Sequence, residues 1–176
     1  MIVAGIDPGK NGGIVICNNK TMTIIGKFTI PKIGKEVDLR GLCRIISTYL
    51  TGIPVVLEEP HSIVGTGKGS MFTMGRVLGN IEAALACNGI QYQLVSPKDW
   101  QKLVWQPEDI VKVKSKTGLK MVNDTKATSL NAVKRLFPEA DFKYGDLEKV
   151  SGRRSNEHDG LVDAALISMY SYYATK

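Results

Sequence analysis

The start of the chain constrains the fold most strongly, because it joins an apolar strand, a carboxylate and a glycine-rich turn. The residues before Asp7 are apolar or small, and Pro8, Gly9, Gly12 and Gly13 follow it. This pattern predicts a buried strand that ends at Asp7 in a tight turn. A buried Asp needs a metal, a cation or hydrogen bonds to compensate its charge. The turn amides at positions 9 and 10 offer one such role, and catalysis is the other.

A second segment repeats this arrangement. Residues 54–60 run from Pro54 through an apolar stretch into Glu58 and Glu59, and Pro60 follows. The pattern predicts another buried strand that carries a carboxylate at its carboxyl end. Two strands therefore deliver acids to strand ends.

A third source of acids is the last helix, which the sequence predicts over about residues 156–173. Asp159 and Asp163 are four residues apart and therefore share one face of the helix. They flank a predicted core-facing stripe of Val162, Leu166, Met169 and Tyr173. Asp159 would also complement the helix dipole in the first turn, a role that explains Asp163 less well.

Oxygen ligands from several elements, without a Cys or His cluster, suit Mg²⁺ or Mn²⁺ rather than zinc. Two such ions can activate a water molecule and stabilise the leaving oxygen in phosphodiester hydrolysis. The formal net charge of +6 favours a polyanionic partner. A basic protein with this acid set is typical of a nuclease.

The remaining pattern predicts one domain over residues 1–176 and no membrane span. Three cysteines, Cys17, Cys43 and Cys87, lie in apolar segments, so we expect reduced core thiols in a cytoplasmic protein. Three successive strands near the N-terminus predict an antiparallel meander. The expected strands cover residues 13–17, 21–30 and 90–95, and the expected helices cover 36–50, 71–87, 98–104 and 126–137. Residues 61–70 and 105–122 are expected to lack regular structure.

Two stretches of this pattern have more than one interpretation. Gly75, Gly79 and Ala83 form a flat helix stripe, for which we expect close backbone packing against the sheet or a partner helix. Trp100 and Trp105 are interpreted as core or dimer packing.

The order of elements and three motifs resemble RuvC-type Holliday-junction resolvases, which have a ribonuclease H-like fold. The motifs are Gly5-Ile6-Asp7-Pro8-Gly9, Val56-Leu57-Glu58-Glu59-Pro60 and the segment from His158 to Leu166. The resemblance covers essentially the whole chain. It implies an α/β fold with a five-stranded mixed sheet, formed by a three-strand antiparallel meander and two parallel strands. It also implies a cytoplasmic protein of a bacterial cell or a phage.

The resemblance implies that Asp7, Glu58, Asp159 and Asp163 are the catalytic residues and hold two Mg²⁺ or Mn²⁺ ions. His158 and Glu59 are auxiliary candidates. The family's two helix acids are commonly three residues apart, whereas here Gly160 stands at that position. Asp159 would therefore ligate with a different geometry.

The resemblance further implies a homodimer whose two sites nick opposed strands of a four-way DNA junction. The expected DNA contacts are Lys68, Phe72, Lys112, Lys114, Lys116, Lys120, Lys126, Arg153 and Arg154. Phe72 follows a glycine-rich loop that resembles the family's junction-centre loop, although a core position in its helix would explain it equally well.

Two other functions remain open. One is a ribonuclease H-like nuclease that acts on other branched, flap or RNA-containing substrates. The other is a junction-binding protein without catalysis, which the clustered acids disfavour because acids weaken phosphate binding. An actin-like ATPase would need a duplicated subdomain that 176 residues do not provide.

Overall fold

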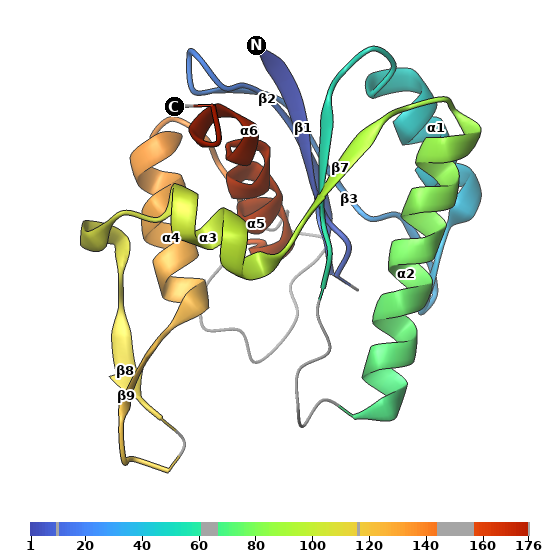
Figure 1. Cartoon of the computed structure of the whole chain (residues 1–176). Helices are drawn as coiled ribbons and strands as arrows, with labels where there is room; N and C mark the ends of the chain where they lie inside the picture. The colour runs from blue at the N-terminus through green and yellow to red at the C-terminus, as the bar shows by residue number, and fades with distance from the viewer. Residues whose placement is uncertain (10, 61–66, 116, 144–156, 176) are drawn as a thin grey trace.

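The protein is built on one central five-stranded sheet (Figure 1). The computed structural model describes residues 1–9, 11–60, 67–115, 117–143 and 157–175. The strands of this sheet are β1 (Ile2–Asp7), β2 (Gly13–Asn18), β3 (Thr23–Thr29), β6 (Val55–Glu58) and β7 (Tyr92–Val95). Their order across the sheet is β3-β2-β1-β6-β7.

The pairing directions confirm the predicted fold class. Strands β1, β2 and β3 pair antiparallel as a meander, and β6 and β7 run parallel to β1. A short hairpin of β4 (Lys32–Ile33) and β5 (Glu36–Val37) follows the meander. The predicted helix over residues 36–50 was wrong at its start, because Glu36 and Val37 pair with β4. The helix begins only after Asp38, whose carboxylate accepts the Arg40 N–H.

Helices cover both faces of the sheet (Figure 1). On one face lie α1 (Leu39–Tyr49) and α2 (Lys68–Cys87). On the other face lie α3 (Pro97–Val104), α4 (Thr125–Leu136), α5 (Asp159–Ser168) and α6 (Tyr170–Tyr173). The predicted last helix is divided at Met169 and begins at Asp159, while residue 156 lies outside the described part of the chain.

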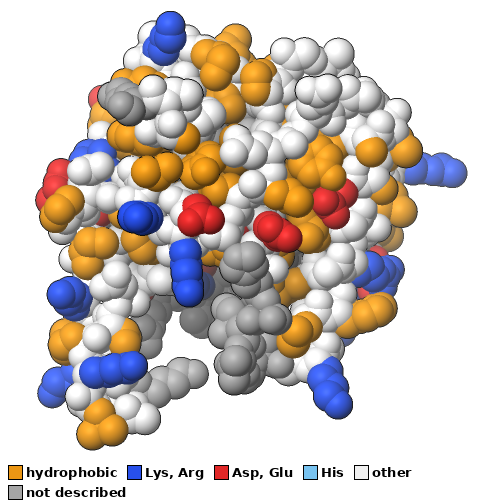
Figure 2. Space-filling model, viewed as in Figure 1, with side chains coloured by type: hydrophobic (Ala, Val, Ile, Leu, Met, Phe, Trp, Pro, Cys, Tyr) orange, Lys and Arg blue, Asp and Glu red, His pale blue; other side chains and the backbone are white. Residues whose placement is uncertain are grey.

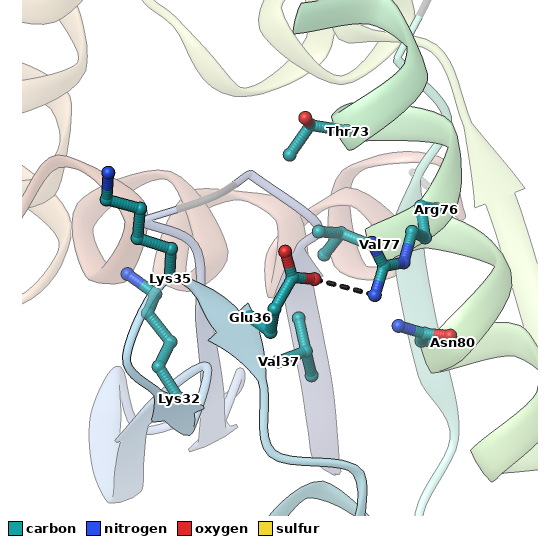
Figure 3. Close-up of a pocket in the computed structure, with 8 residues that line it drawn as sticks. All are labelled: Lys32, Lys35, Glu36, Val37, Thr73, Arg76, Val77 and Asn80. Carbon is teal, nitrogen blue, oxygen red and sulfur yellow. Dashed lines mark ion pairs between the residues drawn. The ribbon is translucent and has the colours of Figure 1, made fainter. Parts of the chain in front are cut away.

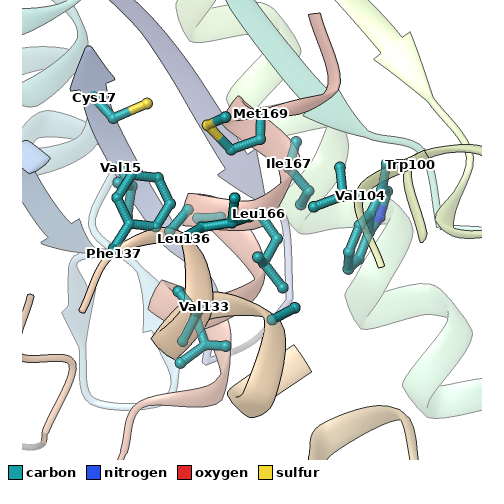
Figure 4. Close-up of a cluster of buried hydrophobic side chains, with 14 of the residues drawn as sticks. Val15, Cys17, Trp100, Val104, Val133, Leu136, Phe137, Leu166, Ile167 and Met169 are labelled. Atoms are coloured by element: carbon teal, nitrogen blue, oxygen red, sulfur yellow. The ribbon is translucent and has the colours of Figure 1, made fainter. Parts of the chain in front are cut away.

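Two hydrophobic clusters follow from the alternation of side chains along the strands. Val3 and Val15 face α3, α4 and α5, and Figure 4 shows Leu166, Phe137 and Trp100 in that cluster. Ala4, Ile6, Ile14 and Ile16 belong to the second cluster, with α1 and α2. The sheet therefore has a helix layer packed on each face.

The segment 105–122 differs from the prediction of irregular structure. It contains a 3₁₀ turn at Pro107–Asp109 and a hairpin of β8 (Lys112–Lys114) and β9 (Met121–Asn123). The turn is held by Arg135 of α4, whose guanidinium donates to Asp109 at 2.6 Å and to the Val104 carbonyl at 3.0 Å. This long-range contact leaves no trace in local periodicity.

Two further expectations were wrong. Cys17 is buried as predicted, but Cys43 and Cys87 are exposed. The stripe of Gly75, Gly79 and Ala83 is exposed and faces away from the sheet, so it does not pack there, and a Cβ built on either glycine meets nothing within 4 Å among the described residues.

The helix that carries this stripe also starts earlier than predicted, at Lys68, while residues 61–66 of the preceding loop lie outside the described residues. In the described part of the chain, every helix is too short or too polar to cross a membrane.

Candidate active site

The carboxyl ends of two neighbouring strands bring Asp7 and Glu58 to one edge of the sheet. Strands β1 and β6 run parallel, with Ile6 aligned to Leu57, so the residues that follow both strand positions lie side by side. Both carboxylates are half-buried. The edge is where ligands bind in open sheets with parallel strands.

Helix α5 lies against β1 at backbone distance because glycines remove the intervening side chains. A Cβ at Gly5 would stand 2.1 Å from the carbonyl oxygen of Ala164. At the other contact, Gly160 pairs with Gly12, and a Cβ on Gly160 would stand 2.1 Å from the carbonyl oxygen of Asn11. Neither clash could be relieved without shifting the helix.

This close contact determines which residues of α5 remain accessible. All ten residues of the helix are described, and Asp159 and Asp163 are the two that are not buried. Gly160, the position three residues before Asp163, has no room for a carboxylate. The spacing of four between the acids therefore has a steric reason in this chain.

The four carboxylates interact electrostatically. Burial, and to a lesser degree the charge of Asp159, raise the pKa of Asp7 to about 6. Burial and the Asp7 charge raise the pKa of Glu58 to about 7. The pKa of Asp163 is raised well above its usual value by burial and by the charges of Asp7, Glu58 and Asp159. These groups share a region of unfavourable negative charge.

Each carboxylate also has a hydrogen-bond or ion-pair partner. The Gly9 N–H donates to Asp7 Oδ1 at 2.8 Å, as expected for the turn, while residue 10 lies outside the described residues. The Lys126 ammonium contacts Asp159 Oδ2 at 2.6 Å. The Gly9 contact lowers the pKa of Asp7 but does not cancel the effect of burial.

Two partners were missed by the sequence analysis. The Trp100 indole Nε1 donates to Glu58 Oε2 at 2.7 Å, and the Ser129 hydroxyl hydrogen-bonds to Asp163. Trp100 and Ser129 are both buried. Trp100 shows the core packing that was predicted, and it also binds a site carboxylate. Neither contact has a sequence signal, since each joins residues from different elements.

The two auxiliary candidates have different surroundings. His158 is buried and caps α5, where its Nδ1 accepts the Leu161 N–H at 3.3 Å. That ring nitrogen is occupied as a helix cap. Glu59 is exposed, and its backbone N–H donates to the Val95 carbonyl across to β7. In the parts of the chain that are described, no three His, Cys, Asp or Glu side chains have metal-binding spacing.

The predicted DNA contacts lie on several elements around this edge. Lys112, Lys114 and Lys120 are exposed on the β8–β9 hairpin, and Lys126 stands at the start of α4. Figure 2 shows acidic side chains near the middle of one face and Lys and Arg side chains at lower left, where Figure 1 places the β8–β9 hairpin.

The remaining predicted contacts lie near α2 or outside the described residues. Lys68 begins α2, and Phe72 is 71% exposed, which excludes a core position for this ring. Lys116, Arg153 and Arg154 lie outside the described residues.

Cavities lined by described residues lie away from the carboxylates. A small one of about 30 Å³ lies between the β4–β5 hairpin and α2, where Arg76 and Glu36 form an ion pair at 2.6 Å (Figure 3). Lys32 and Lys35 also line it. A larger cavity of about 480 Å³ lies at the opposite end of the sheet, where β6 and β7 begin.

Comparisons with known proteins support the fold rather than a sequence family. No family model matches the chain, and no curated protein matches its sequence. Among solved structures, *Thermus thermophilus* RuvC in complex with a Holliday junction substrate superposes with a TM-score of 0.63 at 16% identity. That match covers 99% of this chain and 94% of the other.

A second *Thermus thermophilus* RuvC structure gives a TM-score of 0.61 at 17% identity, covering 99% of this chain and 96% of that one. The chain therefore has a RuvC-like, ribonuclease H-like fold along nearly its entire length.

Proposed function

We propose that residues 1–176 act as one domain and form a metal-dependent, structure-selective DNA endonuclease that resolves four-way junctions by paired symmetric nicks. The observation that carries this proposal is the group of mutually repelling carboxylates Asp7, Glu58 and Asp163 at one sheet edge. A fold maintains such repulsion at a cost, which is typical of a functional site. The RuvC-like fold supports the same reading, since one neighbour is a complex with a Holliday junction substrate.

The chemistry of these donors fits Mg²⁺ or Mn²⁺. All candidate ligands are carboxylate oxygens, which hard divalent cations prefer. Asp7, Glu58, Asp159 and Asp163 would hold the ions, two in each site. When bound, such ions activate water and stabilise the leaving oxygen during phosphodiester hydrolysis.

The chain's own residues prepare this site. The indole N–H of Trp100 orients Glu58, and the Ser129 hydroxyl orients Asp163. Both donors favour the ionised carboxylate, which is the form that ligates a cation. Lys126 sits against Asp159, where its ammonium is available to a DNA phosphate.

Binding to branched DNA is supported by the lysines around this edge. Lys112, Lys114, Lys120 and Lys68 are exposed, and phosphate contacts of this kind give affinity that falls with salt. Lys116, Arg153 and Arg154 complete the proposed set.

A homodimer would pair two such sites. The exposed stripe of Gly75, Gly79 and Ala83 on α2 allows close approach of another helix, and Phe72 is exposed nearer the N-terminal end of the same helix.

The proposal is tested with a synthetic four-way junction labelled on each strand in turn, incubated with Mg²⁺ or Mn²⁺ and with EDTA. A Y-fork, an RNA–DNA flap and a linear duplex serve as matched substrates. Paired symmetric nicks on the junction, lost with EDTA and far slower on duplex, are expected. Sedimentation of the protein with and without junction measures the dimer.

Two other outcomes would replace the proposal. Metal-dependent cutting of the fork or flap without symmetric pairing would assign the chain to another ribonuclease H-like nuclease activity. Junction binding without cutting under every metal condition would leave a non-catalytic binding protein.

A further inference from the structure

Hydrogen bonds anchor the base of the β8–β9 hairpin to neighbouring elements. The Asp124 N–H donates to the Val111 carbonyl at 2.8 Å, and the Val111 N–H donates to the Thr128 hydroxyl at 3.1 Å. Thr128 is fully buried, and the Asn131 amide binds the Asp109 carbonyl from the same helix. The hairpin is therefore anchored to α4 at its foot, and its outer part projects from the body (Figure 1).

The projecting part has an unusual surface. Residues 112–123 contain four lysines and no acid. Leu119 is 88% exposed and Met121 is 55% exposed. Neither side chain contributes to the core, so the fold gives no reason for their apolar character. Figure 2 shows hydrophobic and basic side chains side by side over the β8–β9 hairpin at lower left.

The strand register sorts these side chains by face. Lys112 pairs with Asn123 and Lys114 with Met121, while Val113 pairs with Val122. Directly opposed residues share a face, so Lys112, Lys114 and Met121 lie on one side of the ribbon. A face that carries both cations and an apolar side chain suits a groove of a nucleic-acid duplex. Phosphates border such a groove, and the base edges form its floor.

The hairpin is also connected through the chain to a residue that contacts a site carboxylate. Strand β9 leads through Asp124 into α4, whose first turn carries the Lys126 that contacts Asp159. The tip lies about five residues beyond that junction, or roughly 16 Å along an extended strand. This reach corresponds to roughly five base pairs of DNA.

We propose that the β8–β9 ribbon enters the major groove of a duplex arm, roughly five base pairs from the cut. The lysines contact phosphates, and Leu119 and Met121 contact base edges, including thymine methyl groups. The major groove admits a two-stranded ribbon of this kind. This inference rests on the proposed DNA substrate and adds where on it the hairpin binds.

The test measures binding to four-way junctions in EDTA, with arms that shorten in steps from about 15 to about 4 base pairs. Two double variants are compared, Leu119→Ser with Met121→Ser, and Lys112→Gln with Lys114→Gln. Ile25→Ser and Lys20→Gln are the matched controls, because Ile25 is 54% exposed and both residues lie toward the opposite end of the sheet. Thermal unfolding checks that each variant is folded.

The apolar variant is expected to bind long arms roughly three- to tenfold more weakly than wild type and arms too short for the hairpin equally well. Uracil in place of thymine within the reached segment should weaken wild type and leave this variant unchanged. The lysine variant should lower the salt slope of log K by about 1.8. Both controls should follow wild type.

The inference would be overturned if both double variants bound junctions like the controls at every arm length. It would also be overturned if their loss of affinity were the same at every arm length. These outcomes are separable from failure of the nuclease proposal. A protein that shows the arm-length and uracil effects but never cuts would support the hairpin role and refute the nuclease.

Discussion

The two ends of the central sheet differ in chemistry and in the space they enclose. At the end where β1 and β6 finish, half-buried carboxylates raise one another's pKa. At the end where β6 and β7 begin, a cavity of about 480 Å³ is lined by residues such as Ile53, Pro54 and Gln93, with no Lys, Arg, His, Asp or Glu in its lining. The lining of this cavity therefore lacks ionisable side chains, in contrast to the carboxylate edge.

The difference follows from strand direction. Parallel strands present their carboxyl ends at one edge, where loops and helix starts converge on a ligand. If function depends on that edge alone, substitutions there should change cleavage and substitutions at the opposite end should not.

The largest effect is expected at Asp7, whose charge interacts with all three other site acids. Asp7→Asn removes a proposed cation ligand, so junction cleavage should fall by about a thousandfold or more. Junction binding should stay intact or become tighter, because a negative charge near the phosphates is lost. Cleavage and gel-shift assays on one preparation separate the two effects. Cutting at the wild-type rate would refute the metal role of Asp7.

A second large effect is expected where α5 contacts the turn after β1. Gly160→Ala places a Cβ 2.1 Å from the Asn11 carbonyl oxygen, which must push the helix away from β1. We expect unfolding free energy to fall by about 1–3 kcal/mol, with a large loss of cleavage. Gly69→Ala is the control, since its Cβ meets none of the described residues within 4 Å. Equal melting temperatures for the two variants would contradict the contact.

The raised pKa values predict how stability depends on pH in the absence of metal. Folding raises the pKa of Asp7 to about 6 and of Glu58 to about 7, so the native state binds protons more tightly than the unfolded chain. The stability that these two protonated groups contribute is complete below about pH 3.8, the ordinary pKa of Asp, and is lost as pH rises through about 6 to 7. Unfolding free energy should fall by on the order of 2 kcal/mol between pH 5 and pH 8 in EDTA, allowing for partial solvent access.

Thermal unfolding across this pH range, with EDTA and with Mg²⁺, measures the effect. The cation should reduce the decline, because it stabilises the ionised carboxylates. Asp7→Asn should also reduce it. A melting temperature that rises from pH 5 to pH 8 in EDTA would contradict the predicted direction.

A smaller effect is expected from the indole that contacts Glu58. Trp100→Phe keeps most of the buried ring but removes the hydrogen bond, so cleavage should fall by about tenfold. Because that donor lowers the Glu58 pKa, its loss should also shift the pH–rate profile to higher pH. Trp105→Phe is the control, since the Trp105 Nε1 is buried and has no hydrogen-bond partner in the described part of the chain. The same shift in both variants would show a packing effect instead.

The smallest effect is expected at the opposite end of the sheet. Ser171 lines the larger cavity, and its buried hydroxyl has no hydrogen-bond partner among the residues that the structure describes. Ser171→Ala should keep cleavage within about twofold of wild type, with equal or slightly higher stability. A cleavage loss comparable with that of Trp100→Phe would break the contrast between the two ends.

Local sequence patterns predicted the sheet because each strand is long enough to be recognised by its apolar run and its terminating turn. The meander, strand β6 and helix α4 lie within a few residues of their expected bounds. The failures occur where a distant contact decides the structure. Glu36 and Val37 pair with β4 instead of joining α1, and Arg135 orders the turn at Asp109.

The sequence by itself determined that Asp7 and Glu58 each end an apolar strand and that Asp159 and Asp163 share a helix face, because these relations depend on local periodicity. Tertiary structure alone decided the rest. Backbone contact at Gly5 and Gly160 brings that helix onto β1, and Trp100 and Ser129 reach the carboxylates from other helices. Contacts between elements far apart in the chain depend on packing, so the local sequence around each residue does not predict them.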